Sequence, residues 1–402
     1  MEVRLQVSSQ LAAGALAGVV VGAAASGGLR IVATRGREWV SKTLFGPSSS
    51  GGKKAQASAK PTRPAASTTE DIATVTEEEE EERAEERDAF WFKEGLTEDF
   101  RVELALQNIS FDARSTFQRV QVIETTQFGR TLVMDGQTQS AEADEHIYHE
   151  SLVHPAMLLH KSPKKVFIGG GGEFATAREV LRHSSVERCV MIDIDEVACD
   201  ICRKQLPEWN GGAYEDPRFH VKYKDALRWL EDTEETFDVI IMDICDPIEA
   251  GPGYKLYTNE FYEYVQKHRL NEGGILVTQS GPGAVYNAQK ECFTVIHSTL
   301  RSAFDVVVPY AVDVPSFGCN WGFNLAFKSS DPEADKRDVL NRDVEEFNNE
   351  IEKRIKGGMD GMRFLDGLAW RGISGLPKEI RQQCEEEDRV MTIDNPVFMF
   401  AS

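Results

Sequence analysis

Two aspartates, Asp243 and Asp246, lie three positions apart and directly follow the apolar run 239–242. That run predicts a buried strand, and side chains at the carboxyl end of such a strand face the crevice where open α/β sheets bind ligands. In a partly dry cleft, one carboxylate of a close pair can be held near neutrality and act as a base, and both can hold a cationic substrate. Taken alone, the pair fits a solvated acidic turn equally well.

Three more acids follow other predicted strands, each at the strand's carboxyl end. Glu173 closes a glycine-rich loop in which Gly170 and Gly172 would let the backbone approach a ligand closely. Asp193 lies where an acid accepts hydrogen bonds from ribose hydroxyls, and Asp225 could accept one from an adenine amino group. Because no lysine or arginine stands at the matching positions, a nucleoside fits this crevice and a phosphate does not. The chemistry implied is transfer from a sulfonium nucleoside to an amine.

The elements that must position these acids alternate between strand and helix. Five apolar runs separated by helical segments predict a mainly parallel Rossmann-like sheet, and they span 165–168, 190–192, 220–223, 239–242 and 275–278. Upstream, short alternating runs between turns predict a small antiparallel β domain. The predicted fold class is therefore α/β, with a Rossmann-like sheet preceded by this β domain. The predicted domains are a β domain at 90–145, a catalytic domain at 146–328 and a C-terminal helical extension at 329–402.

Residues 1–89 differ in composition from the rest and predict a disordered N-terminal region. Segment 11–29 is uncharged and rich in Ala and Gly, with arginines behind it. It is compatible with a membrane anchor, with an organelle-targeting peptide, or with neither. The acidic run 77–88 predicts disorder or a solvated helix. We expect the catalytic part to be cytoplasmic unless 11–29 anchors or targets the chain.

Charge and cysteine content exclude several classes of protein. The formal net charge is −21, and most of it lies after residue 88. Such acidity disfavours nucleic acid as a partner, because phosphates need basic patches, and it favours small cations. Cys199 and Cys202 form a CxxC with no second pair at zinc-site spacing, so core packing is the simpler interpretation and no metal site is expected.

The ordered motifs resemble those of the polyamine (spermidine/spermine) synthases over about residues 90–328. The strongest are the loop Gly170-Gly171-Gly172-Glu173 and the run Asp243-x-x-Asp246-Pro247. The other matching segments are Asp135-Gly136-Gln137-Thr138-Gln139-Ser140, Asp144-Glu145, Tyr148-His149-Glu150, Ile192-Asp193-Ile194-Asp195, Leu256-Tyr257-Thr258, Phe261-Tyr262, Gln279 and Val314-Pro315-Ser316. The resemblance implies an aminopropyltransferase that uses decarboxylated S-adenosylmethionine as co-substrate and a polyamine as acceptor, without a cofactor. It also implies a homo-oligomer.

The resemblance also implies a role for each acid. Asp243 would be the general base for the attacking amine, and Asp246 would hold the acceptor. Glu173 would bind the donor's propylamine, Asp193 its ribose and Asp225 its adenine. The substrate-binding residues implied in this way are Gln118, Gln139, Tyr148, His149, Gly170, Gly172, Glu173, Asp193, Asp225, Asp246 and Tyr310.

Two positions depart from the family pattern. Phe174 stands where the family loop usually has a glycine, so it either narrows the donor pocket or packs the following helix against the sheet. Ala311, next to Tyr310, stands where putrescine-using members carry a tyrosine, which would open room for a longer acceptor. The pattern is most similar to plant-type thermospermine synthases, which use spermidine. A spermidine or spermine synthase, a methyltransferase and a membrane-tethered interaction protein are the alternatives.

Overall fold

The computed structural model describes residues 19–23, 29–35, 38–43, 90–97, 99–249 and 251–399. The chain divides into two compact units, Met1–Thr74 and Val75–Ser402. In the first unit the described residues form a three-stranded antiparallel sheet, with β1 at Val19–Ala23, β2 at Leu29–Arg35 and β3 at Glu38–Thr43.

Only part of segment 11–29 is described, and that part is strand rather than helix. Residues 19–23 belong to β1 and residue 29 begins β2, whereas residues 11–18 and 24–28, and the acidic run 77–88, lie outside the described residues. Within the described ranges, no helix is both long and apolar enough to cross a membrane.

The second unit begins with a five-stranded antiparallel sheet whose strands are ordered as in the sequence, β4-β5-β6-β7-β8. Its strands are Phe90–Thr97, Phe100–Arg114, Arg119–Thr125, Gly129–Met134 and Gln137–Ala141. Asp135 and Gly136 both have positive φ, 48° and 89°, as the tight turn between β7 and β8 requires. The predicted small antiparallel sheet is thus confirmed.

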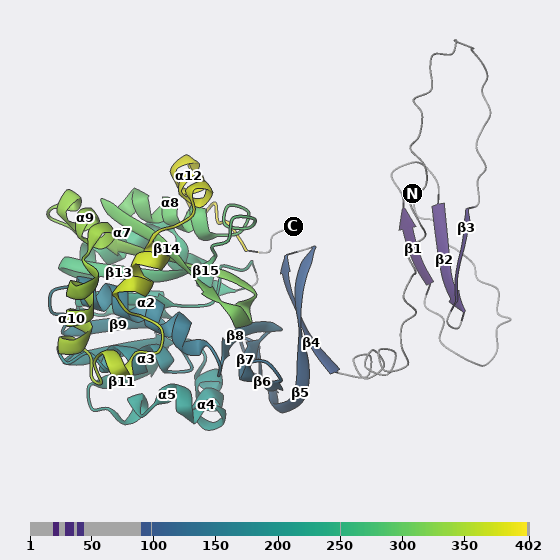
Figure 1. The fold of residues 1–402 in the computed structure, drawn as a ribbon, viewed down its shortest axis with the longest axis horizontal. Coiled ribbons are helices and arrows are strands. Elements are labelled where there is room, and N and C mark those ends of the chain that lie inside the picture. The colour runs from purple at the N-terminus through teal and green to yellow at the C-terminus, as the bar shows by residue number, and fades with distance from the viewer. Residues whose placement is uncertain are drawn as a thin grey trace, which may run out of the picture. The chain divides into compact units, whose positions relative to one another are not determined.

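A seven-stranded sheet of order β11-β10-β9-β12-β13-β15-β14 forms the rest of the unit (Figure 1). Its first five strands are parallel, and β15 is antiparallel to both neighbours. The strands are β9 Lys165–Gly170, β10 Arg188–Asp193, β11 Phe219–Tyr223, β12 Phe237–Asp243, β13 Leu270–Pro282, β14 Val306–Val314 and β15 Cys319–Phe327. This arrangement confirms the predicted Rossmann-like fold, and the antiparallel pair β14 and β15 extends the sheet at one edge.

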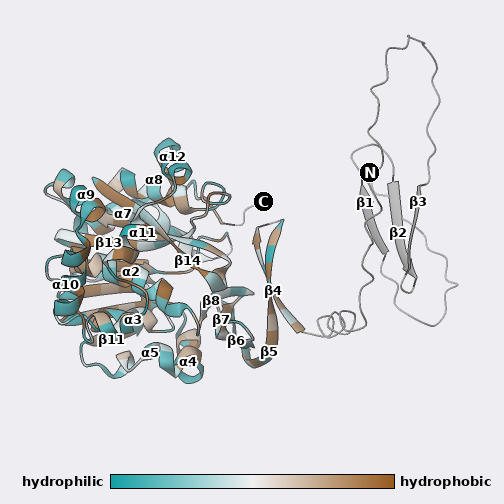
Figure 2. Ribbon diagram, viewed as in Figure 1, coloured by the Kyte–Doolittle hydropathy of each residue, from teal (hydrophilic) through white to brown (hydrophobic). Residues whose placement is uncertain are grey.

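Helices cover both faces of this sheet. The helices and 3₁₀ turns are α2 Glu145–Leu159, α3 Ala175–Leu181, α4 Glu196–Gln205, α5 Pro207–Asn210, η1 Ala213–Glu215, α6 Ala226–Asp232, η2 Pro252–Tyr257, α7 Asn259–His268, α8 Phe293–Ala303, η3 Pro315–Phe317, α9 Pro332–Asn341, α10 Val344–Arg354, η4 Met359–Gly361, α11 Gly367–Ser374 and α12 Lys378–Glu386. Successive strand residues point to opposite faces, so Val166 and Ile168 join one apolar cluster and Phe167 joins the other. Burial on both faces explains why the central strands are continuous apolar runs (Figure 2).

Phe174 packs α3 against the sheet and does not reach the cavity described below. Its side chain is fully buried, and its ring lies edge-on to Tyr214 and Phe219 at centroid distances of 5.6 and 6.1 Å. Its φ of 69° lies in the left-handed region that favours glycine. The packing interpretation is therefore the one that the structure supports, and narrowing of the donor pocket is not.

The positive φ of Phe174 leads to a small, signed prediction. Both Phe174→Ala and Phe174→Gly remove the same ring, but only alanine keeps the steric cost of the left-handed backbone, which is about 1 kcal/mol. We expect Phe174→Gly to have the larger free energy of unfolding of the two variants by about that amount, measured by urea denaturation. Equal free energies of unfolding, or a more stable alanine variant, would contradict the inference that the backbone at position 174 is strained.

The C-terminal helical segment is tied to the helix that precedes β9. Glu150 on α2 is 1% exposed, and its carboxylate accepts hydrogen bonds from the backbone N–H groups of Arg363, Phe364 and Leu365 at 2.9, 2.9 and 2.8 Å. Three such bonds satisfy a buried carboxylate without a cationic partner. They fix the turn of α2 that also carries Tyr148 and His149.

Candidate active site

A cavity of about 570 Å³ opens where the parallel strands of the large sheet end. Residues at the carboxyl ends of β9, β10, β11 and β12 line it, together with residues of the antiparallel sheet. Among the described residues, seven side chains that line it carry a carboxylate and two are basic, Arg114 and Lys255; the acids are Glu94, Asp135, Glu173, Asp193, Asp225, Asp243 and Asp246. Such a surplus of negative charge in a concave site favours a ligand with several positive charges.

Asp243 is held at the end of β12 by two hydroxyl groups. Tyr148 on α2 donates to Oδ1 at 2.7 Å, and Thr176 on α3 donates to Oδ2 at 2.5 Å. Burial and the nearby Glu173 carboxylate raise the pKa of Asp243 to about 6, against the opposing effects of His149 and the two hydroxyls. A carboxyl group with this pKa is ionised at neutral pH yet basic enough to take a proton.

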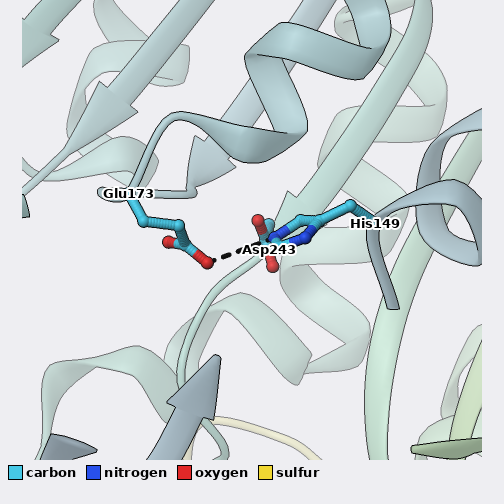
Figure 3. Close-up of side chains that lie close together, drawn as sticks. All are labelled: His149, Glu173 and Asp243. Carbon is cyan, nitrogen blue, oxygen red and sulfur yellow. Dashed lines mark hydrogen bonds and ion pairs between the residues drawn. The ribbon is translucent and has the colours of Figure 1, made fainter. Parts of the chain in front are cut away.

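His149 forms a charged link between Glu145 and Glu173. Figure 3 shows its contact with Glu173, beside Asp243. Its Nδ1 lies 2.8 Å from Oε2 of Glu145, and its Nε2 lies 3.2 Å from Oε1 of Glu173. Burial alone would lower the pKa of His149, but these two carboxylates raise it to about 10. The imidazolium therefore offsets the repulsion between Glu173 and Asp243.

The same side chains could geometrically hold a metal ion. Ligand atoms of His149, Glu173 and Asp243 all lie within 4.8 Å of one another. In this structure both ring nitrogens of His149 contact carboxylates, Nδ1 that of Glu145 and Nε2 that of Glu173. In this arrangement the imidazole is part of an ion-pair network.

The glycine-rich loop closely approaches Asp243 and Asp193. A Cβ atom on Gly170, whose φ is 79°, would lie 2.1 Å from the backbone oxygen of Asp243. A Cβ atom on Gly172 would lie 3.1 Å from Oδ2 of Asp193. The backbone N–H of Gly171 donates to the carbonyl of Asp243 at 2.9 Å. A side chain at Gly170 would displace the backbone of Asp243, and one at Gly172 would crowd the Asp193 carboxylate, so the loop positions the site directly.

On the other side of that loop, Asp193 and Asp225 lie at the ends of β10 and β11. Oδ1 of Asp193 accepts a hydrogen bond from the N–H of Asp195 at 2.8 Å, and burial raises the pKa of Asp193 to about 7. Asp225 caps α6 by accepting from the N–H of Arg228 at 3.0 Å while it also lines the cavity. The Nε2 of Gln118 donates to Oδ2 of Asp195 at 3.1 Å, which brings the antiparallel sheet to this end of the cavity.

Asp246 lies at the opposite end, in a network that the sequence does not reveal. The Nε2 of Gln279 donates to Oδ1 of Asp246 at 3.1 Å and lies 2.7 Å from the hydroxyl of Tyr257. Nε1 of Trp321 donates to Oε1 of Gln279 at 3.1 Å. Burial raises the pKa of Asp246 to about 7. Gln279 and Tyr257 match family motifs in the sequence, but neither they nor Trp321 were among the predicted site residues.

Glu94 is a further site residue that the sequence analysis missed. It is 8% exposed, lines the cavity, and accepts hydrogen bonds from the N–H and hydroxyl of Thr138 at 3.1 and 2.6 Å. Burial raises its pKa despite those bonds. Cys319 lines the same cavity, and burial, then the charges of Asp246 and Glu94, raise the pKa of its thiol to about 12. The sequence does carry a signal for Glu94, because residues two apart in a strand share a face, and Leu96 on that face is also buried.

Tyr310 was predicted as a substrate-binding residue, but it does not line the cavity. Its side chain is fully buried, its hydroxyl donates to the carbonyl of Ser151 at 2.7 Å, and its ring stacks on Phe323. Ala311 packs against a separate apolar cluster and does not line the cavity. The alanine at this position therefore forms no part of the cavity wall.

The structure gathers the remaining predicted residues in one place. The cavity is lined by Gln118, Gln139, Tyr148, Gly170, Gly172, Glu173, Asp193, Asp225, Asp243 and Asp246. His149 lies behind this surface and acts on it through Glu173. The Nε2 of Gln139 donates to the backbone oxygen of Gln137 at 3.3 Å. The arrangement can bind a cation and remove a proton from it.

Two family models match the chain over adjacent segments. Residues 145–338 match a spermine/spermidine synthase domain, and residues 90–142 match a spermidine synthase tetramerisation domain. A polyamine aminopropyltransferase of Aeropyrum pernix is 42% identical over 310 residues, which cover 77% of this chain and 95% of that protein. Thermospermine synthase ACAULIS5 of Arabidopsis thaliana is 39% identical over 316 residues, covering 79% and 89%.

A solved structure agrees with these sequence relatives. A spermidine synthase in complex with the transition state analogue AdoDATO has a TM-score of 0.65 and 27% sequence identity, covering 74% of this chain and 96% of that one. On these sequence and structural grounds, the chain belongs to the spermine/spermidine synthase family of polyamine aminopropyltransferases.

Proposed function

We propose that the protein transfers the aminopropyl group of decarboxylated S-adenosylmethionine to spermidine, forming thermospermine and methylthioadenosine. The observation that carries this proposal is the pair of carboxylates on one turn, Asp243 and Asp246, inside one acidic cavity. The pair supplies a base and a cation anchor, as transfer to an amine requires. The 39% identity to a thermospermine synthase supports spermidine as acceptor.

The donor would occupy the end of the cavity formed by the glycine-rich loop. Asp193 would accept hydrogen bonds from the ribose and Asp225 from the adenine amino group. Glu173 would bind the ammonium of the donor's aminopropyl group. Because His149 already neutralises part of the Glu173 charge, the site can hold both this ammonium and the ionised base without a large excess of negative charge.

Asp243 would act on the acceptor in a single displacement step. An ammonium has no lone pair, so the attacking nitrogen must first lose a proton, and Asp243 takes it. The nitrogen then forms a bond to the aminopropyl carbon as the carbon–sulfur bond breaks, and the bonding electrons stay on sulfur, leaving neutral methylthioadenosine. Holding nitrogen and carbon in line supplies much of the rate. The sulfonium is a good leaving group, so we propose no cofactor or metal.

The acceptor would lie along the end of the cavity that contains Asp246 and Glu94. Both carboxylates line the cavity together with Cys319, Glu94 buried and Asp246 partly buried, and a polyamine carries ammonium groups separated by methylene chains. Two anchors of this kind suit an acceptor with more than one charge beyond the attacking nitrogen. We also propose a homo-oligomer, for which the match to a tetramerisation domain is the support.

One assay tests the proposal against its alternatives. The full chain is incubated with decarboxylated S-adenosylmethionine and, separately, with putrescine, spermidine or spermine, and the products are resolved chromatographically. We expect spermidine to be consumed and thermospermine to form. Spermine as the product would contradict the thermospermine assignment. Use of ordinary S-adenosylmethionine, with no aminopropyl product, would indicate a methyltransferase and contradict the proposal as a whole.

The raised pKa of Asp243 predicts an acid limb in the rate profile. The base works only when ionised, so below a pKa of about 6 its ionised fraction falls about tenfold for each pH unit. We expect kcat/KM for spermidine, measured at saturating donor, to fall with that slope as the pH drops below about 6. A profile that is flat from pH 7 to pH 5 would contradict the assignment of Asp243 as the base.

A further inference from the structure

The C-terminal tail, residues 391–399, runs from α12 back to the cavity. Its start is fixed by backbone contacts: Asn259 N–H donates to the carbonyl of Met391 at 2.8 Å, and Met391 N–H donates to the hydroxyl of Thr299 at 2.9 Å. The N–H of Ile393 lies 3.3 Å from both carboxylate oxygens of Glu260. The tail is therefore docked on α7 and α8 before it reaches the site. All of it lies beyond residue 338, where the match to the synthase domain ends.

The last described residues of the tail hold the segment that carries Asp246. Met399 N–H donates to the carbonyl of Pro247 at 2.8 Å, one residue after Asp246. The ring of Phe398 lies edge-on to that of Tyr254 at 5.6 Å. These two contacts join the tail to both sides of the turn that follows β12, so the position of Asp246 depends on the tail.

The Met399 side chain itself forms part of the cavity wall. It is 5% exposed, and it lines the cavity that contains the acidic residues. A Cβ atom built on Gly281 would lie 3.3 Å from Sδ of Met399 and 3.5 Å from Oδ1 of Asp246. The thioether and the carboxylate therefore flank the same point, at the end of the cavity opposite the glycine-rich loop.

We propose that Met399 is a specificity-determining residue for the acceptor, which it contacts as the apolar wall beside Asp246. This inference rests on the proposed function. Asp246 would bind an ammonium, and the methylene chain next to that ammonium needs an apolar surface within van der Waals reach. A methionine side chain is unbranched and adaptable, so it can follow a flexible aliphatic chain. Because the tail fixes Met399 relative to Asp246, the distance between the Met399 side chain and the Asp246 carboxylate selects acceptors by the length of their methylene chain.

The test compares three variants of the full chain: Met399→Ala, the volume-conserving Met399→Leu, and Val397→Ala as a matched control. Val397 lies in the same tail and packs against the core beneath it but does not line the cavity. For each variant, kcat and KM are measured for putrescine, spermidine and spermine at saturating donor, and KM is measured for the donor. Circular dichroism and thermal unfolding report whether each variant is folded.

We expect Met399→Ala to raise KM for spermidine about tenfold, since one or two lost methylene contacts in a pocket have an effect of this order. The preference among the three acceptors should narrow, and KM for the donor should stay unchanged. Met399→Leu should recover most of the loss, and Val397→Ala should leave acceptor KM unchanged.

Other outcomes would overturn the inference. An unchanged acceptor KM in Met399→Ala would contradict it while leaving the proposed function intact. Equal rises in donor and acceptor KM would assign Met399 a general structural role, as would a Val397→Ala variant with the same acceptor defect. A wild-type chain that transfers no aminopropyl group to any polyamine would instead contradict the proposed function, and the acceptor role of Met399 with it.

Discussion

Replacing Asp243 with asparagine is expected to lower kcat by at least about 10³-fold, because an amide cannot accept the proton that the attacking nitrogen must lose. The substitution keeps the shape of the side chain, and its oxygen can still accept the Tyr148 or Thr176 hydroxyl. The carboxylates that we propose bind the donor are untouched. We therefore expect the Kd for decarboxylated S-adenosylmethionine, measured by calorimetry, to change little.

Asp305→Asn provides a matched control for this experiment. Asp305 is exposed, lies just before β14 and is remote from the cavity, so its substitution should leave both kcat and donor Kd unchanged. An Asp243→Asn variant that keeps more than about one tenth of the wild-type kcat would contradict the role of Asp243 as base. A large increase in donor Kd would instead indicate that Asp243 binds the donor.

The positions of the acids at the sheet edge could be predicted from the sequence for a simple geometric reason. Continuous apolar runs mark strands buried on both faces, and the carboxyl ends of parallel strands meet at one edge. Residues that directly follow such runs, such as Asp193, Asp225 and Asp243, must therefore come together. This argument needs only local patterns and the rule for strand order, and the structure places all three on one cavity.

The sequence analysis placed Tyr310 in the site and overlooked Glu94 because it did not ask which face of its strand each side chain occupies. In β14, Tyr310 shares its face with Val308 and Val312, which are both buried in the core. Alternation along β14 thus indicates that Tyr310 is a core residue, whereas its position next to Ala311 in the family pattern had suggested a substrate-binding residue. Glu94, by contrast, was overlooked. It lies on the same face of β4 as the buried Leu96, and an acid on a buried face needs a polar cavity or a hydrogen-bond partner. In both cases the period of two carries information that the motif does not.

Contacts between distant segments explain what no local pattern could predict. Glu150 accepts hydrogen bonds from residues more than 200 positions later, and Met399 reaches a turn more than 150 positions earlier. Neither the C-terminal helices nor the tail carries a motif that marks these contacts. The charge state of His149 likewise depends on Glu145 and Glu173 lying on opposite sides of its ring, which only the fold brings about.

Replacing Asp246 with asparagine should have the opposite kinetic signature to Asp243→Asn. In the proposed mechanism Asp246 does not take the proton but anchors an ammonium of the acceptor inside the cavity, and breaking such a buried charge pair typically costs about 2–5 kcal/mol or more. We therefore expect KM for spermidine to rise by about 10²-fold or more, a smaller change in kcat at saturating spermidine, and an unchanged donor Kd.

The same steady-state measurements decide whether the two aspartates have separate roles. If Asp246→Asn lowers kcat as strongly as Asp243→Asn does, with little change in acceptor KM, then Asp246 acts in the chemical step. A double variant that loses no more than Asp243→Asn alone would lead to the same conclusion, because groups that act as one unit are not additive. Separate roles predict instead that the losses in kcat and in acceptor KM combine. The hydrogen bond from Gln279 to Asp246, and the hydroxyls that hold Asp243 alone, favour this second outcome.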